Sequence, residues 1–203
     1  MSSHQPPSPR REELLESAYA YVLEHGLTEL SLRPLTRAIG SSPRVILFLF
    51  GSKDGLVQAL LARARRDERA LIESLRPTQA PALPVVVHRI WEWLAAPERR
   101  GLLILWAESY TRSLVEPDGA WAGFATATVD DWLSLLAEAQ TPELRATPRG
   151  EAQRTLSLAI LRGALLDLLA TGDRQRTTAA VELALRNMSG ALYGIPRSPM
   201  RYR

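Results

Sequence analysis

Apolar residues in the first part of the chain recur three or four positions apart, the spacing that places them on one face of a helix. The pattern follows Ser8 and Pro9, which match a helix N-cap and a proline in the first helical turn, and it stops at Gly26, a residue suited to a helix C-terminus. The residues of this face are Leu14, Leu15, Ala18, Val22 and Leu23. The pattern predicts a helix that begins at Pro9 and ends before Gly26.

Two short helices and one long helix follow, each bounded by residues typical of helix ends. The boundary residues are Ser31 and Gly40 for the second helix, Ser42, Pro43 and Gly51 for the third, and Ser52 for the fourth. Because the second and third helices are too short to be stable alone, they depend on packing. Short helices joined by such tight turns predict a helix-turn-helix domain over 9–52, followed by a connecting helix over 53–76.

A Pro- and Ala-rich stretch over 77–84 interrupts the pattern and marks the predicted domain boundary. Beyond it the apolar spacing is helical throughout, and no alternating strand pattern occurs. The predicted helices cover about 84–95, 99–115, 118–140, 149–171 and 174–193. The sequence therefore predicts an all-α fold with a second helical domain over 77–195, flanked by a disordered tail over 1–8 and a basic tail over 196–203.

The composition narrows the classes of function. The chain has 203 residues, of which 46% are hydrophobic and 23% charged, as in an ordinary globular protein. With no cysteine, three histidines and no phosphate-loop or nucleophile motif, we expect no enzyme activity, no catalytic residue, no metal and no cofactor. No apolar run approaches the ~18 residues that cross a bilayer, and no signal peptide is evident, so the sequence predicts a cytoplasmic protein with no membrane partner.

Positive charge gathers in one stretch of the helix-turn-helix segment. No acidic residue occurs between Glu29 and Asp54. The basic residues in that stretch are Arg33, Arg37, Arg44 and Lys53. A basic stretch without acids suits contact with a polyanion, although a solvated helix face would have the same composition.

Charged side chains farther along the chain are expected at the surface. The mixed cluster on the fourth helix is predicted to be its solvated face; its members are Arg65, Arg66, Asp67, Glu68 and Arg69. The acidic pair Asp130 and Asp131 is expected to be exposed. His88 and Glu92 share a helix face, and either a surface pair or a capped core histidine is expected rather than a metal ligand or a catalytic dyad.

One set of residues between Arg10 and Leu61 has a specific order and spacing, and it ends in the segment FGSKD. Its members are Arg11, Glu12, Leu14, Leu15, Ala18, Gly26, Ser31, Arg33, Leu35, Gly40, Ser42, Ile46, Phe50, Gly51, Ser52, Lys53 and Asp54. By these residues, this segment resembles the N-terminal DNA-binding domain of the tetracycline-repressor (TetR) family. The resemblance covers about a quarter of the chain, and the rest agrees with that family only in length and helicity.

The resemblance implies a ligand-responsive, homodimeric DNA-binding transcriptional regulator. The most typical form is a repressor that a small apolar effector releases from a palindromic operator in double-stranded DNA. The domain over 77–195 would then bind the effector and form the dimer. The alternative is a dimeric helical small-molecule-binding protein whose DNA binding is weakened or lost.

Candidate DNA contacts lie at helix N-termini. A helix in the major groove places its first residues on base edges, and in the third helix these are Ser42, Pro43, Arg44 and Val45. Arg44 can form a bidentate contact to guanine O6 and N7, and Val45 can touch a thymine methyl group. The residues that suit the DNA backbone are Ser31, Arg33 and Arg37 on the preceding helix and Lys53 at the start of the fourth.

The third helix departs from the family pattern. Leu47 stands where the family has a phosphate-binding tyrosine, and Phe48 and Leu49 stand where it has a polar pair. Either Leu47 and Phe48 belong to an apolar surface that reads thymine methyl groups and DNA shape, or DNA binding is weak or absent. The structural alternative is that most of Val45 to Phe50 is core. Ile46 and Phe50 are expected there, but five consecutive residues cannot all lie on one buried face.

The last two predicted helices are long and apolar, and Gly163 and its small neighbours would allow close helix approach. The resemblance implies that they form a four-helix dimer interface, although they could instead cover only the core of their own subunit. The candidate interface residues are Leu158, Leu161, Leu165, Leu168, Leu185 and Met188.

Aromatic residues cluster in the middle of the sequence, between positions 91 and 124. They suggest an apolar effector pocket with a few polar groups, while ordinary core packing is the alternative for each of them. The candidate pocket residues are His88, Trp91, Trp106, Glu108, Tyr110, Trp121 and Phe124.

Overall fold

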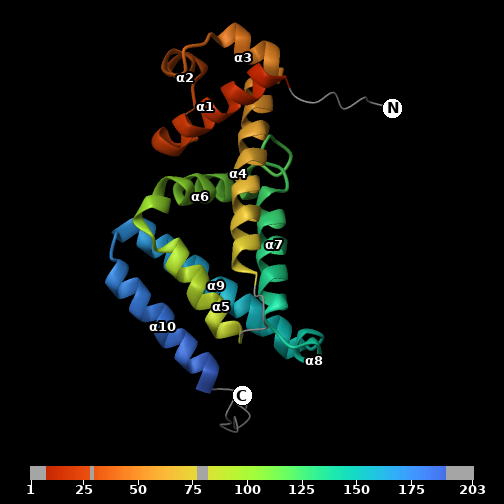
Figure 1. The fold of residues 1–203 in the computed structure, drawn as a ribbon, viewed down its shortest axis with the longest axis vertical. Helices are drawn as coiled ribbons and strands as arrows, with labels where there is room; N and C mark the ends of the chain where they lie inside the picture. The colour runs from red at the N-terminus through yellow and green to blue at the C-terminus, as the bar shows by residue number, and fades with distance from the viewer. Residues whose placement is uncertain (1–7, 28–29, 77–81, 191–203) are drawn as a thin grey trace, which may run out of the picture. The chain divides into compact units, whose positions relative to one another are not determined.

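The computed structural model describes residues 8–27, 30–76 and 82–190, and every regular element in those ranges is a helix. The all-α prediction is therefore confirmed. The α-helices are labelled in Figure 1. The elements in chain order are α1 (Pro9–His25), α2 (Leu32–Ala38), α3 (Pro43–Phe50), α4 (Lys53–Leu75), α5 (Leu83–Leu94), the 3-10 turn η1 (Pro97–Arg99), α6 (Arg100–Val115), α7 (Phe124–Glu138), α8 (Pro142–Arg145), α9 (Pro148–Thr171) and α10 (Arg174–Gly190).

The first four helices begin and end where the sequence predicts, within a residue or two. Serine side chains cap three of them: Ser8 accepts a hydrogen bond from Arg11 N at 3.3 Å, Ser42 from Val45 N at 3.3 Å, and Ser52 from Gly55 N at 2.9 Å. Each bond satisfies a backbone donor that the helix itself leaves unpaired. These local bonds explain why the sequence alone located the helix starts.

The predicted helix over 118–140 is wrong at its start. The chain first makes successive turns, with Ala122 N bonded to Gly119 O at 3.1 Å and Phe124 N to Trp121 O at 3.2 Å. Gly123 then has a φ of +73°, which breaks any regular helix before α7 begins at Phe124. The short helix α8 was not predicted. The predicted tail over 1–8 lies outside the described residues except for Ser8, and the predicted tail over 196–203 lies outside them entirely. The predicted helix over 174–193 is described only as far as residue 190.

The chain forms two compact units whose limits differ from the single predicted boundary at 77–84. The first unit comprises residues up to Ser74 together with Pro97–Trp132, and the second comprises Leu75–Ala96 and Leu133 onward. Residues 97–132 thus group with the N-terminal helices, although the sequence analysis assigned them to the second domain. A break in the sequence pattern follows chain order, whereas a compact unit is defined by long-range packing.

The core of the first unit lies between α1, α2, α3 and α4 (Figure 1), with contributions from α6 and from Trp121 and Phe124. Its most completely buried side chains include Leu14, Leu35, Ile46, Leu56 and Leu60. Because α2 and α3 each contribute apolar residues to this core, packing holds two helices that are too short to be stable alone.

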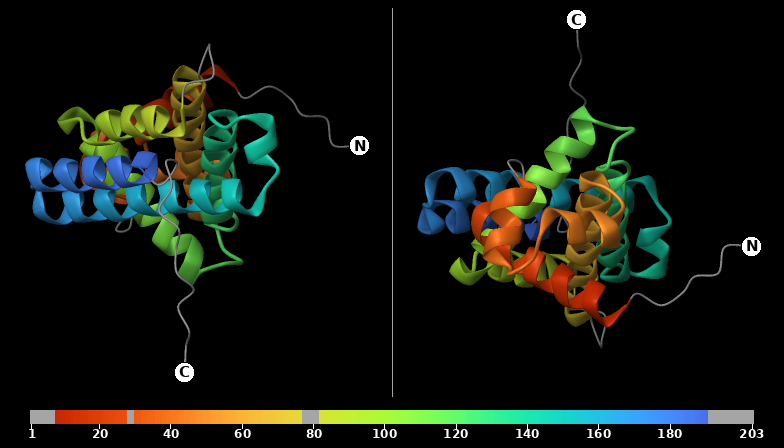
Figure 2. Two further views of the ribbon diagram at one scale, coloured as in Figure 1. Left: turned by 90° about the horizontal axis from the view of Figure 1, so that it is seen from below. Right: turned by 90° about the horizontal axis from the view of Figure 1, so that it is seen from above.

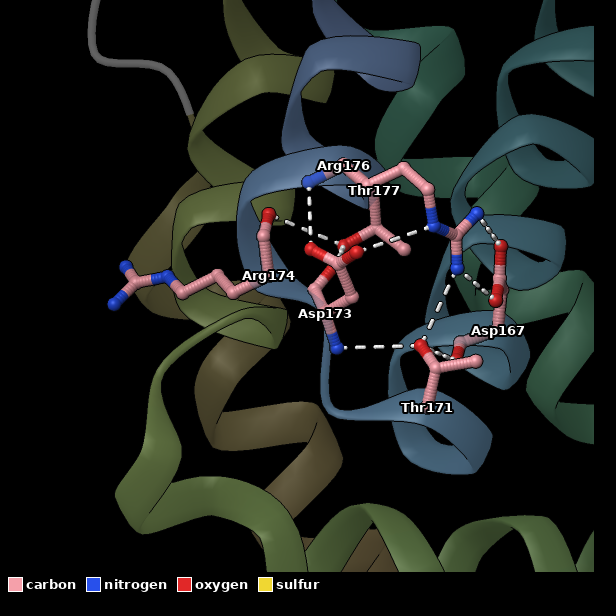
Figure 3. Close-up of polar contacts among 6 residues, drawn as sticks. All are labelled: Asp167, Thr171, Asp173, Arg174, Arg176 and Thr177. Atoms are coloured by element: carbon pink, nitrogen blue, oxygen red, sulfur yellow. Dashed lines mark hydrogen bonds and ion pairs between the residues drawn. The ribbon is translucent and has the colours of Figure 1, made fainter.

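In the second unit α9 and α10 lie side by side as an antiparallel hairpin (Figure 2), and both contact α5. Figure 3 shows the turn between them. Arg176 makes a bidentate pair with Asp167 at 2.6 and 2.7 Å, and Asp173 caps α10 by accepting from Arg176 N at 3.0 Å. The Arg176 guanidinium lowers the pKa of the Asp167 carboxyl. Gly172, with a φ of +72°, closes the turn, so side chains and backbone together fix the hairpin geometry.

None of the described helices has, on its own, the length and hydropathy of a membrane span. The pair α3 and α4, bent by 69° at their junction, meets that test of length and composition only when taken together.

Candidate nucleic-acid interface

The turn between α2 and α3 is short and built from small residues. Gly40 has a φ of +63°, a conformation that favours glycine, and Ser41 N donates to Thr36 O at 2.8 Å. Ser42 then caps α3, and Pro43 occupies the first turn of that helix. The structure therefore contains the predicted helix-turn-helix, with α3 in the position of a recognition helix.

The C-terminal end of α3 lies in close contact with the first turn of α4. Gly51 ends the helix with a φ of +79°, and a side chain at Gly55 would place its Cβ 2.0 Å from Phe50 O. The first turn of α4 therefore contacts the backbone at the end of α3 directly, which only glycine permits at this position.

Arg11 also anchors α3, and the sequence analysis gave it no role. Its Nε donates to Leu49 O at 3.3 Å, and its guanidinium lies 4.8 Å from the centre of the Phe50 ring. The contact spans 38 positions of sequence. Local pattern could not reveal it, although Arg11 belongs to the set of residues that carried the family resemblance.

The side chains of α3 divide into two faces. Ile46 and Phe50 are buried, as predicted, and Leu49 is partly buried against the same core. On the other side Val45 is 37% exposed, Leu47 41% and Phe48 86%, and Arg44 is exposed next to them. The apolar run of α3 is thus only half core, and its remaining half forms a surface.

The four cations of the acid-free stretch are all exposed: Arg33, Arg37, Arg44 and Lys53. Within the described residues none of them has a carboxylate oxygen within 4.0 Å. By contrast, α1 and α4 pair their arginines, as in Arg10 with Glu13 at 2.8 Å and Arg63 with Glu16 at 2.6 Å. The unpaired charges of α2, α3 and the start of α4 remain available to an external anion.

The remaining predicted contact residues also lie on this part of the first unit. Ser31 and Ser42 are exposed and Pro43 is half-buried. The Ser42 hydroxyl already serves as the helix cap, so its first role is structural.

Two polar clusters hold α4 in the first unit. Tyr19 donates to Asp67 at 2.9 Å, and Arg63 bonds both Asp67 and Glu16 while lying over the Tyr19 ring. Burial, together with the charge of Asp67, raises the pKa of the Tyr19 hydroxyl above its ordinary range. These contacts join α1 to α4 and set the position of the helix that follows α3.

The second cluster corrects the predicted solvated face of α4. Arg65 and Glu68 are each only 11% exposed and lie 2.5 Å apart. Glu68 also accepts from Trp132 Nε1 at 2.6 Å, and Arg65 bonds Asp131, so that carboxylate is not freely exposed either. Burial raises the pKa of Glu68 despite the neighbouring guanidinium. The charges are inside because α7 packs on this side of α4, a contact that the sequence period of α4 cannot show.

The candidate pocket residues fall in both compact units. His88 and Trp91 belong to the second, where Trp91 is buried and donates to Thr178 at 3.0 Å, and the others belong to the first. His88 lies 3.6 Å from Glu92 with its side chain 44% exposed, which confirms the predicted surface pair.

Several pocket candidates in the first unit have structural partners. Glu108 accepts from Leu27 N at 2.7 Å and so holds the backbone after α1. Trp121 and Phe124 are buried in the core with α1 and α4. The rings of Trp106 and Tyr110 lie 5.2 Å apart. These contacts favour the alternative of ordinary packing, and the pocket stays a prediction.

Most of the candidate dimer residues are buried in the single chain. The four buried ones are Leu158, Leu161, Leu165 and Leu185, while Leu168 and Met188 are half-buried, and the interface stays a prediction. The opposite face of α9 is exposed and apolar, with a spacing of three and four positions. Its members are Leu156, Ala159, Gly163, Leu166 and Ala170. The leucines predicted for the interface are therefore mostly the ones that are buried in the single chain.

In the described residues, no group of three or more histidine, cysteine, aspartate or glutamate side chains could hold a metal ion. The charged residues singled out in the first unit are exposed cations on a helix-turn-helix. Together with the helical second unit, this defines the class: an α-helical protein with an N-terminal helix-turn-helix.

Solved structures extend this description to the whole chain. A TetR-family transcriptional regulator from Cytophaga hutchinsonii has a TM-score of 0.74 at 16% identity, over 93% of this chain and 98% of that one. A transcriptional regulator from Rhodococcus sp. Rha1 has a TM-score of 0.74 at 18% identity, over 92% and 99%. The multidrug binding protein EbrR, complexed with imidazole, has a TM-score of 0.63 at 24% identity, over 89% and 94%.

The chain therefore has the fold of TetR-family transcriptional regulators, and the resemblance seen in the sequence is confirmed at the level of fold. No family model matches the chain, and a search of curated proteins found no match.

Proposed function

We propose that this chain is a TetR-family DNA-binding transcriptional regulator. The observation that carries the proposal is the set of exposed, unpaired cations of the helix-turn-helix: Arg33 and Arg37 on α2, Arg44 on α3 and Lys53 at the start of α4. In the free chain these side chains have no anionic partner among the described residues, and the phosphate backbone of DNA would supply one. The fold supports the same function, because the solved structures that share it include TetR-family regulators.

We further propose that the regulator is a homodimer that binds a palindromic operator. Two recognition helices related by a two-fold axis reach successive major grooves about 34–36 Å apart. The exposed face of α9 from Leu156 to Ala170 suits the dimer contact, since its small residues allow a partner helix to approach closely. The hairpin turn shown in Figure 3 fixes α9 and α10 as a unit that can present this face.

Repression and release by a small apolar effector complete the proposal. The fold is shared with EbrR, whose structure is described as that of a multidrug binding protein complexed with imidazole. The aromatic candidates Trp106 and Tyr110, whose rings lie 5.2 Å apart on α6, are the residues we propose to test first for effector contact. An effector that favours a different separation of the two helix-turn-helix domains would lower operator affinity by about 5- to 150-fold, for a coupling free energy of about 1–3 kcal/mol.

The decisive experiment is selection from a randomised pool of double-stranded oligonucleotides with the full chain at low ionic strength. We expect enrichment of a site with two inverted half-sites, and affinity that falls steeply as salt increases. Failure to retain any duplex, specific or not, would remove the proposed function.

That failure would favour a second candidate, a dimeric helical small-molecule-binding protein. The observation in its favour is the apolar composition of α3, where Leu47 and Phe48 replace the polar side chains typical of the family. Binding of apolar ligands by a chain that ignores DNA would establish it.

A further inference from the structure

The outward face of α3 combines one cation with three apolar side chains. Phe48 is 86% exposed, more than any other large apolar residue in the described ranges, and Val45 and Leu47 lie beside it at 37% and 41%. Single exposed apolar residues are normal on a protein surface. Three on an eight-residue helix that also carries the unpaired Arg44 indicate a surface that is covered when the protein acts.

Helical geometry places Phe48 directly beside Arg44. Residues four apart are separated by about 40° around the helix axis and about 6 Å along it. Val45 and Leu47 flank this pair, while Ile46 and Phe50 point into the core. The Ser42 cap and the Arg11 contact to Leu49 O hold the helix at both ends, so the face is presented in one orientation.

The chemistry of the major groove offers one apolar partner, the C5-methyl group of thymine. The surrounding cations make a polyanion the fitting occupant of this surface, rather than an apolar protein partner. Arg44 supplies the donors for guanine, and Phe48 supplies a ring that can pack on a methyl group.

We propose, on the basis of the function proposed above, that Phe48 is a specificity-determining residue that reads thymine by its methyl group. Base pairs are stacked about 3.4 Å apart, so a side chain about 6 Å along the helix from Arg44 reaches a base one or two steps away. The operator half-site therefore contains a thymine within one or two base pairs of the guanine that Arg44 contacts, and Leu47 packs against the same methyl group or its neighbour.

The first test replaces thymine by deoxyuridine, one position at a time, in the best site selected with the full chain. Deoxyuridine lacks only the methyl group and keeps the base pair. We expect binding about fourfold weaker at each contacted thymine, the effect of removing one buried methyl-sized group. The affected thymines should lie one or two base pairs from the guanine that Arg44→Ala no longer distinguishes.

The second test compares Phe48→Ala with Leu114→Ala, which removes a 64% exposed leucine from α6. Both changes remove exposed side chains, so unfolding should be little altered in either variant. Phe48→Ala should bind the selected site roughly tenfold more weakly, lose most of the preference for thymine over deoxyuridine, and keep its affinity for random duplex. Leu114→Ala should keep all three properties.

The outcomes separate this inference from the proposed function. Specific DNA binding that is indifferent to deoxyuridine and to Phe48→Ala overturns the reading of thymine and leaves the regulator intact. A change of oligomeric state in Phe48→Ala, with unchanged DNA preference, assigns Phe48 to a protein contact and also overturns the inference. Absence of any DNA binding by the unmodified chain removes the proposed function first.

Discussion

At the scale of the residue, the side chains of α3 differ in their burial. Ile46 and Phe50 stabilise the first unit by burial, whereas Arg44 and Phe48 are exposed. An exposed side chain with no partner can be replaced at little cost in stability, so its effect on DNA binding can be measured cleanly.

Arg44→Ala should weaken binding to the best site by about 1–3 kcal/mol and relax the preference at one base pair. The reason is the loss of a bidentate contact to guanine. Competitive binding to single-base variants of the site measures it, with Arg174→Ala as the control. Arg174 is an equally exposed arginine on α10 whose side chain makes no contact in Figure 3. An equal loss in both variants would mean that only total charge matters.

Lys53→Ala should weaken binding to all sequences alike. Lys53 lies at the N-terminus of α4, where backbone N–H groups and the helix dipole already favour a phosphate. The slope of log K against log salt should fall in magnitude by about 1, measured by titration at several salt concentrations. A slope that stays the same would show that Lys53 touches no phosphate.

At the scale of the element, the close approach of α4 to the end of α3 determines which residue is allowed at position 55, and helix propensity does not. The first turn of α4 lies so near Phe50 O that position 55 accepts only glycine, although glycine is unfavourable within a helix by about 1 kcal/mol. The angle between α3 and α4 therefore depends on one missing Cβ atom.

Gly55→Ala should lower the free energy of unfolding by about 1–3 kcal/mol, because a Cβ 2.0 Å from a carbonyl oxygen forces α3 and α4 apart. Denaturant unfolding measures the loss. Gly119→Ala is the control, since its Cβ would make only ordinary contacts at 3.8 and 3.9 Å. Equal stability of the two variants would contradict the close approach.

The cluster of Glu68, Arg65 and Trp132 between α4 and α7 predicts a pH effect. Burial raises the pKa of Glu68 above its ordinary 4.5, so the folded chain holds this proton at a higher pH than the unfolded chain does. The contribution to stability is full below pH 4.5 and is lost as the pH rises through the raised pKa. The free energy of unfolding of the unmodified chain minus that of Glu68→Gln should therefore fall over this window. A difference that rises with pH would show that Arg65 dominates and that the pKa is lowered.

At the scale of the whole molecule, the proposed regulator depends on pairing two chains. The leucines that pack α9 against its own unit cannot also form the pair, which leaves the face from Leu156 to Ala170. Its spacing of three and four positions is that of helices that pack side by side.

Leu166→Arg should convert the dimer to a monomer, because it places a charge in the middle of the proposed contact. We expect dissociation to become at least about 30-fold more favourable, measured by sedimentation, with operator affinity reduced as a consequence. Leu114→Arg, on α6, makes the same change at an exposed leucine outside this face and should leave the chain dimeric. A Leu166→Arg chain that stays dimeric would place the interface elsewhere.

The sequence by itself determined the helices and the helix-turn-helix, because N-caps, helix-ending glycines and apolar spacing act over a few neighbouring residues. It also located the cluster of cations, because no acidic residue occurs between Glu29 and Asp54. Whether those cations have carboxylate partners depends on the folded chain. Only the tertiary structure decided the partners that come from distant segments. Arg11 donates a hydrogen bond to α3, and Trp132 of α7 donates one to the buried Glu68. Residues 97–132 belong to the first unit, and Leu161 and Leu165 are buried in the folded chain. Each of these depends on packing between residues tens of positions apart, which no local pattern records.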